Sequence, residues 1–130
     1  MSEGRVLLVE DNVDNFELVR FLLEHAGYEV LAAHNGREGL EIARRERPDL
    51  VLMDLSLPEM DGWTAARELK SDPQTAGLPL LAITAHTLPG DRKRALDSGF
   101  DGYISKPINV SNFAQTVAAA IQNKTMPKEG

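Results

Sequence analysis

The chain has 130 residues, enough for one domain with a substantial hydrophobic core and too few for two. It has no cysteine, which excludes a disulfide framework, thiol catalysis and cysteine-ligated metal centres, and its net charge of −6 argues against a nucleic-acid-binding surface. The amino terminus lacks a signal-peptide pattern, and no apolar run approaches the roughly 20 residues of a membrane span. We therefore expect a cytoplasmic protein that binds no membrane and, given its charge, no nucleic acid.

The chain opens with an apolar strand and an amphipathic helix. The predicted strand Val6–Val9 runs directly into two acidic residues. Asn12 can then cap a helix, and Gly27 suits its left-handed end. The expected apolar face of this helix consists of Phe16, Val19, Leu22, Leu23 and Ala26. A second strand is predicted over Glu29–Ala33.

A helix rich in small residues and a fully apolar strand come next. The helix is expected to end before Pro48, and its small residues would let it lie close to the sheet. Its inward positions recur every three or four residues, at Gly36, Gly39, Leu40 and Ala43. The strand Leu50–Asp54 has four apolar residues followed by a carboxylate, which suits a strand covered on both faces, as in a parallel sheet.

The third helix is predicted to begin near Gly62 and to end before Asp72, with Trp63 packed in the core. Its other inward positions are Ala66 and Leu69. The next strand is predicted over Leu80–Thr84.

The segment Gly90–Ser98 has few apolar residues to hold it in place. Only Ala95 and Leu96 offer apolar anchors, and Arg92 to Arg94 read as a solvated helix face because acidic residues flank them. We therefore expect this segment to be the element that moves most readily.

A short strand over Gly102–Ile104 and a final helix complete the pattern. Ser111 can cap this helix, and Lys124–Gly130 is expected to form a flexible tail. The residues expected on its buried side are Val110, Phe113, Ala114, Val117, Ala120 and Ile121. The alternation predicts an α/β fold, a doubly wound five-stranded parallel sheet of order 2-1-3-4-5, in a single domain over 1–130 with its core at about 5–123.

Three carboxylates follow strands that are neighbours in this order. Glu10 and Asp11 follow the first strand and Asp54 ends the third, so all three would project into one crevice. Their repulsion would raise a pKa unless a cation neutralised them, and Mg²⁺ is the simplest such cation. Asp11 and Asp54 could then be direct ligands, with Glu10 holding a bound water. Unpaired surface acids are the alternative.

A hydroxyl and an ammonium follow the other two strands at the same rim. Thr84 ends the fourth strand and Lys106 follows the fifth. The formal charges of the three carboxylates, a divalent ion and Lys106 sum to zero, and a phosphoryl group on Asp54 would find hydrogen-bond donors in Thr84 and Lys106. Each residue alone also suits an ordinary strand end or surface amine.

At this point the chain resembles a response-regulator receiver domain, the CheY-like phosphoacceptor module of two-component signalling, which has a flavodoxin-like (βα)5 fold. The resemblance covers about residues 5–123. It rests on five fragments, namely Leu8-Val9-Glu10-Asp11-Asn12, Pro48-Asp49-Leu50-Val51-Leu52-Met53-Asp54, Leu57-Pro58-Glu59-Met60-Asp61-Gly62, Thr84-Ala85 and Tyr103-Ile104-Ser105-Lys106-Pro107.

The resemblance implies specific roles for the acidic residues. Asp54 would accept a phosphoryl group from a phosphohistidine. Glu10 stands where the family often has Asp, and Glu10, Asp11, Asp54 and the backbone carbonyl of Ser56 would bind magnesium.

The resemblance also implies a switch. Thr84 would turn inward to bond the phosphoryl group, and Tyr103 would follow it from exposed to buried. Lys106 would contact a phosphoryl oxygen, and its peptide bond to Pro107 is expected to be cis. His86 lies where the family tunes the lifetime of the phosphoryl group.

The resemblance implies partners as well. A histidine kinase or histidine phosphotransfer protein would donate the phosphoryl group, and an effector protein would bind the face of the fourth helix, fifth strand and fifth helix. We expect a stand-alone regulator, because the chain ends too soon for an effector domain. We also expect it to be a monomer or a weak dimer. Single-domain regulators of the DivK cell-cycle type are most similar, while a chemotaxis-type regulator and a phosphorelay intermediate remain open.

Two other functions compete with this interpretation. A phosphatase of the haloacid-dehalogenase type also uses an aspartyl nucleophile, but it needs an acid two residues later, where this chain has Ser56. A receiver-like module that has lost phosphorylation would usually lack part of the acid, threonine and lysine set, and this chain keeps all of it.

Overall fold

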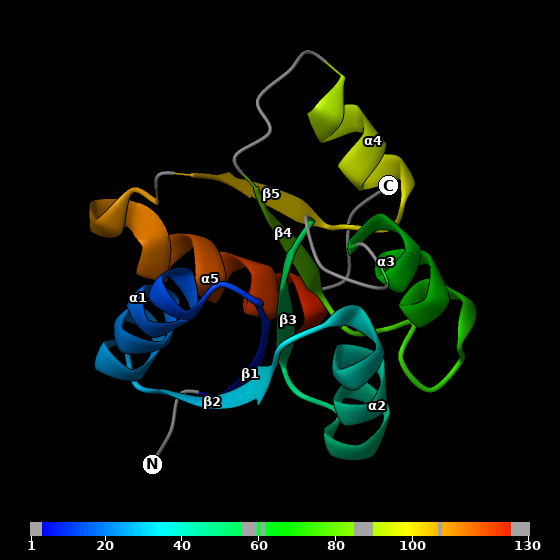
Figure 1. Ribbon diagram of the computed structural model, residues 1–130, viewed down its shortest axis with the longest axis horizontal. Coiled ribbons are helices and arrows are strands. Elements are labelled where there is room, and N and C mark those ends of the chain that lie inside the picture. The colour runs from blue at the N-terminus through cyan, green and yellow to red at the C-terminus, as the bar shows by residue number, and fades with distance from the viewer. Residues whose placement is uncertain (1–3, 56–59, 61, 85–89, 107, 126–130) are drawn as a thin grey trace.

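The computed structural model describes residues 4–55, 60, 62–84, 90–106 and 108–125, and it confirms the predicted sheet (Figure 1). All strand pairs are parallel, in the order β2-β1-β3-β4-β5. The strands are β1 (Gly4–Val9), β2 (Tyr28–Ala33), β3 (Leu50–Asp54), β4 (Leu80–Thr84) and β5 (Gly102–Ser105). β3 and β4 have the predicted bounds, and the others are longer by one or two residues at one end.

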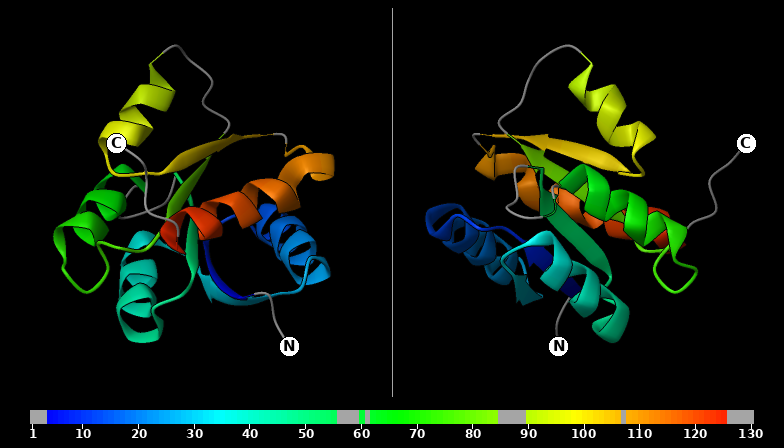
Figure 2. Two further views of the ribbon diagram at one scale, coloured as in Figure 1. Left: turned by 180° about the vertical axis from the view of Figure 1, so that it is seen from behind. Right: turned by 45° about the vertical axis from the view of Figure 1, so that its right-hand side comes forward.

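Helices cover both faces of the sheet, as Figures 1 and 2 show. They are α1 (Val13–His25), α2 (Gly36–Glu46), α3 (Gly62–Ser71), α4 (Asp91–Asp97) and α5 (Val110–Thr125). α1 and α5 pack on one face, and α2, α3 and α4 lie on the other. None of the helices in the described part of the chain is long and apolar enough to cross a membrane.

The strands separate two apolar clusters because successive side chains point to opposite faces. On the α2 to α4 side the strand residues include Leu7, Val9, Val51, Met53, Leu80 and Ala82. On the α1 and α5 side they include Val6, Leu8, Leu50, Leu52, Leu81 and Ile83. Every residue of β3 and β4 is buried, which confirms that the apolar run ending at Asp54 is covered on both faces.

The ends of α1 and the close packing of α2 agree with the sequence. The Asn12 side chain accepts a hydrogen bond from the backbone N–H of Asn15 (2.9 Å), and the helix ends before Gly27, whose φ is 99°. α2 lies so close to β1 that a Cβ on Gly39 would be 2.9 Å from Val9 Cγ2. This helix–sheet contact therefore requires a glycine at position 39.

The packing of Trp63 is confirmed, whereas one expected anchor of α4 is wrong. Trp63 is 9% exposed, and its ring meets that of Phe100 edge to face with the centroids 6.4 Å apart. In α4, Ala95 is buried but Leu96 is 46% exposed. Adjacent helical residues point about 100° apart, so a seven-residue helix on a sheet buries one of them and exposes the other.

The start of α5 also differs from the prediction. The Asn109 side chain, rather than that of Ser111, caps the helix, since its Oδ1 accepts hydrogen bonds from the backbone N–H (3.1 Å) and hydroxyl (2.6 Å) of Ser111. Val110 is 59% exposed because helical side chains lean toward the N-terminus, which directs this first residue past the helix end. Ala114 is exposed because it lies beside the buried stripe. The helix also includes Lys124, which was expected in the tail.

Candidate functional site

The ends of β1 and β3 bring the three predicted acids together. Val9 pairs with Met53 in the parallel register, so the residues that follow, Glu10 and Asp54, lie side by side. One carboxylate oxygen from each of Glu10, Asp11 and Asp54 lies within 4.8 Å of the other two. The predicted acidic crevice is therefore present.

Two of these acids are buried, and this burial changes their electrostatics. Glu10 is 1% exposed and Asp54 is 5% exposed, while Asp11 is exposed. Burial, a hydrogen bond with Asp54 and the charge of Asp54 raise the pKa of Glu10 to about 7. The backbone N–H of Asn12 donates to Glu10 Oε2 (3.3 Å) and partly opposes this shift. Two neighbouring buried carboxylates therefore need a nearby positive charge.

Lys106 supplies part of this positive charge. Its Nζ donates hydrogen bonds to Asp54 Oδ2 (3.0 Å) and to Glu10 Oε1 (3.4 Å). Burial alone would lower the pKa of Lys106, but the hydrogen bond and charge of Asp54, together with those of Glu10, raise it. The backbone N–H of Lys106 donates to the Thr84 carbonyl (2.8 Å), which ties the end of β5 to the end of β4.

Thr84 lies one residue beyond the point on β4 that faces Asp54 of β3. Asp54 pairs with Ile83, so Thr84 projects from the next residue of β4 at the same sheet edge. Thr84 is 1% exposed. The sequence correctly predicted that it shares a rim with Asp54 and Lys106.

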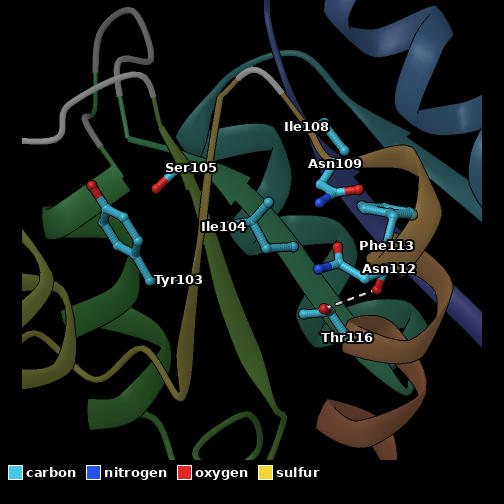
Figure 3. A pocket seen from close by; sticks show the side chains of 8 residues that line it. All are labelled: Tyr103, Ile104, Ser105, Ile108, Asn109, Asn112, Phe113 and Thr116. Carbon is cyan, nitrogen blue, oxygen red and sulfur yellow. Dashed lines mark hydrogen bonds between the residues drawn. The ribbon is translucent and has the colours of Figure 1, made fainter.

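Tyr103 belongs to the edge strand that leads to Lys106. Figure 3 shows Tyr103 and Ser105 on one side of β5, with Ile104 directed to the other side, where α5 lies. Tyr103 is half-buried and packs against the apolar cluster under α2, α3 and α4. Tyr103 therefore lies between the end of β5 that leads to Lys106 and the helix α4.

The chain returns beside Asp54 where α3 begins. The backbone N–H of Gly62 donates to the Leu55 carbonyl (3.2 Å), and a Cβ on Gly62 would lie 2.6 Å from the Asp54 carbonyl oxygen. Such a distance is far below normal contact, so only glycine fits without displacement. The first residue of α3 therefore packs directly against the backbone of the acid.

One rim residue was not assigned to the site from the sequence. His34 is exposed, and its Nδ1 lies 3.4 Å from the Glu10 carbonyl oxygen, with its ring centroid 5.4 Å from that of Phe16. Its place directly after β2, which neighbours β1, is the signal that could have located it. Three residues predicted from the sequence to have a role at or beside the site, Ser56, His86 and Pro107, lie outside the described residues, as do parts of the family fragments, at 57–59, 61 and 85.

The donor set suits a hard divalent cation. Three carboxylates face one ammonium, which leaves two formal negative charges, and the oxygens are close enough to share one ion. Carboxylate oxygens are the ligands that Mg²⁺ prefers. The residues present therefore fit magnesium, and Lys106, which already contacts Asp54 and Glu10, lies where it could also contact an anionic group on Asp54.

Comparison with known proteins places this geometry in a family. The chain matches the model of the response regulator receiver domain over residues 6–118. It is 45% identical to the polar-differentiation response regulator DivK of Brucella anthropi over 112 residues, which cover 86% of this chain and 91% of that protein.

Solved structures agree with this match. The receiver domain of a sensor histidine kinase from Pseudomonas aeruginosa, described with a magnesium ion coordinated in its active-site cleft, has a TM-score of 0.86 and 33% identity and covers 92% of this chain and 98% of that one. The chemotaxis response regulator CheY4 of Vibrio cholerae has a TM-score of 0.84 and 30% identity, with 90% and 98% covered.

Proposed function

Because the chain belongs to the response regulator receiver domain family of two-component signalling, we propose that Asp54 accepts a phosphoryl group from the phosphohistidine of a histidine kinase or histidine phosphotransfer protein. The observation that carries this proposal is the ammonium of Lys106, 3.0 Å from a buried carboxylate that ends a central strand. The same carboxylate also belongs to a cluster of three acids, which an isolated structural acid would not need.

The transfer requires a nucleophile and a means of holding charge. An Asp54 oxygen attacks phosphorus as the N–P bond breaks, and the electron pair of that bond stays on the imidazole nitrogen, which takes a proton from solvent. The product is an acyl phosphate on Asp54. Lys106 and Thr84 donate hydrogen bonds to the oxygens of the transferred group, where negative charge is concentrated.

Glu10, Asp11 and Asp54 would hold Mg²⁺, with the Ser56 carbonyl as the further ligand that the family implies. The bound ion would neutralise the repulsion between an anionic acceptor and an anionic phosphoryl group. Burial first, and then the neighbouring Asp54, raise the pKa of Glu10, and a bound cation would oppose both effects.

The product would act as a signal through Thr84 and Tyr103. Thr84 would bond the phosphoryl group, and Tyr103 would follow it inward. Tyr103 and Ser105 also line a pocket of about 290 Å³ with the first two turns of α5 (Figure 3). We propose that this change controls an effector protein at the face of α4, β5 and α5, and that the chain is a switch rather than a turnover enzyme.

Intact mass tests the proposal directly. The protein, incubated with Mg²⁺ and acetyl phosphate, is expected to gain the mass of one phosphoryl group, and chelation of the metal is expected to prevent the gain. Asp54→Ala should gain nothing, whereas the matched control Asp14→Ala, at an exposed acid of α1, should behave like wild type. An unmodified wild type, or equal modification of Asp54→Ala, would overturn the assignment.

A further inference from the structure

A cleft between α3 and α4 gathers cations that the proposed phosphorylation does not use. The two helices lie side by side on the same face of the sheet (Figures 1 and 2). The cleft has a volume of about 370 Å³, and its lining consists of Arg67, Gly90, Lys93, Arg94, Asp97 and Ser98. Arg67 comes from α3 and the rest come from α4 and its flanks, so the cleft depends on the tertiary fold.

Arg94 is held in place by an aromatic ring. Its guanidinium carbon lies 4.3 Å from the centroid of the Trp63 ring, in a cation–π contact. Trp63 is in turn fixed by its edge-to-face contact with Phe100. Because the ring holds the guanidinium by its face, the N–H groups at its edge stay available to an acceptor.

The cleft has more positive than negative charge. Asp97, the one acid among the described lining residues, already accepts a hydrogen bond from Lys93 Nζ at 2.8 Å. Within the described part of the chain, neither Arg67 nor Arg94 forms an ion pair with a carboxylate. Among the carboxylates that the structure describes, none pairs with either guanidinium, although the net charge of the chain is −6.

We propose that this cleft binds an acidic segment of a partner protein, with carboxylates of the segment paired to Arg67 and Arg94. The planar fork of a guanidinium matches a carboxylate in a bidentate geometry. Two such groups on different helices suit a ligand with several carboxylates, and the cleft is larger than one small anion requires. A long polyanion such as nucleic acid is disfavoured because the rest of the chain would repel it.

A synthetic peptide pair provides the test, and it requires no phosphorylation of Asp54. The first peptide is a fluorescein-labelled decapeptide of alternating Glu and Gly, and the second has Gln in place of each Glu. We expect the Glu peptide to bind the unmodified protein at least about tenfold more tightly by fluorescence anisotropy at low salt, and to lose this advantage at high salt. Amide chemical shifts should change in α3 and α4 and not in α1.

Two double variants distinguish binding in the cleft from nonspecific attraction between charges. Arg67→Gln/Arg94→Gln should weaken binding of the Glu peptide about tenfold or more, whereas Arg37→Gln/Arg45→Gln, which removes two exposed cations of α2, should change it less than about twofold. Arg67→Gln alone, which leaves the contact between Arg94 and Trp63 intact, should weaken binding severalfold. This variant keeps the test valid if loss of Arg94 disturbs α4.

Several outcomes would overturn the proposal. They are equal binding of the Glu and Gln peptides, wild-type affinity in Arg67→Gln/Arg94→Gln, and chemical-shift changes in α3 and α4 with inorganic phosphate but none with the Glu peptide. Phosphorylation of Asp54 is measured separately, so either proposal can fail while the other stands.

Discussion

The two halves of the site are held by very different amounts of packing. In the acid half, which we define as β1 and β3 with Glu10 and Asp54 at their ends, all of β3 and the last four residues of β1 are buried. In the β5–α4 half, which leads to Lys106, no residue of β5 is fully buried. Ala95 is the only buried residue of α4 among those whose burial is described.

This contrast in packing suggests that one half of the site binds charge and the other half changes position in response. Buried carboxylates are tolerated only where rigid surroundings and a cation offset their desolvation. Segments with few buried apolar contacts open at a lower free-energy cost. We therefore infer that the acid half binds the phosphoryl group and its cation, while the β5–α4 half changes position.

The largest expected effect comes from the residue that joins the halves. Lys106→Met should slow phosphorylation of Asp54 by acetyl phosphate about 100-fold, because one pre-organised donor to the transferred oxygens is lost. The initial rate is measured by intact mass, with Lys93→Met on the exposed face of α4 as the control. An unchanged rate in Lys106→Met would remove Lys106 from the chemistry and break the link between the halves.

The stability of the protein should depend on pH through the ionisation of Glu10 in the acid half. An acid with its pKa raised in the folded protein, here from 4.5 to about 7, stabilises the fold fully below pH 4.5 and loses that contribution as the pH rises through 7. Without metal, Glu10→Gln should therefore be more stable than wild type by about 2 kcal/mol at pH 8, with no such gain at pH 4.5. Urea unfolding at both pH values measures this. A gain that is equal at both would show that Glu10 ionisation is not the cause.

Rigidity of the acid half can be tested at Gly62. Gly62→Ala should destabilise the protein by about 2 kcal/mol, because the new Cβ would lie 2.6 Å from the Asp54 carbonyl oxygen and 2.8 Å from Leu55 Cα. Gly77→Ala is the matched control, since a Cβ there meets nothing within 4 Å. If the two variants unfold at the same urea concentration, the acid half is more compliant than its packing indicates.

The smallest effect is expected in α4. Leu96→Ala should change the free energy of unfolding by less than about 0.5 kcal/mol because Leu96 is already half-exposed, whereas Leu69→Ala in α3 should cost about 3 kcal/mol. Chemical denaturation compares the two. A large loss at Leu96 would mean that α4 is held more firmly than its burial indicates.

The sheet and the acid cluster could be predicted because their signals are local. The run Leu50–Asp54 shows in five consecutive residues both a buried strand and the acid at its end. The parallel register then brings Glu10 beside Asp54 with no further information. Thr84 and Lys106 follow from the same rule.

The errors concern residues one or two positions apart that can take each other's structural role. Asn109 and Ser111 are both good helix caps, and the choice between them depends on where α5 meets the sheet. Likewise Ala95 and Leu96 are both apolar, and only packing against β5 decides which is buried. The contact between Arg94 and Trp63 joins two helices that β4 separates in the sequence, so no local pattern could indicate it.

The central claim is that Asp54 carries the phosphoryl group between the two halves. A crystal structure of the protein with Mg²⁺ and beryllium fluoride, a mimic of the phosphoryl group, tests it most directly. The mimic should be bonded to the Asp54 carboxylate and should accept hydrogen bonds from Thr84 and Lys106, with the metal on Glu10, Asp11 and Asp54. A mimic bound to another carboxylate, or a bound mimic that neither Thr84 nor Lys106 contacts, would contradict the account.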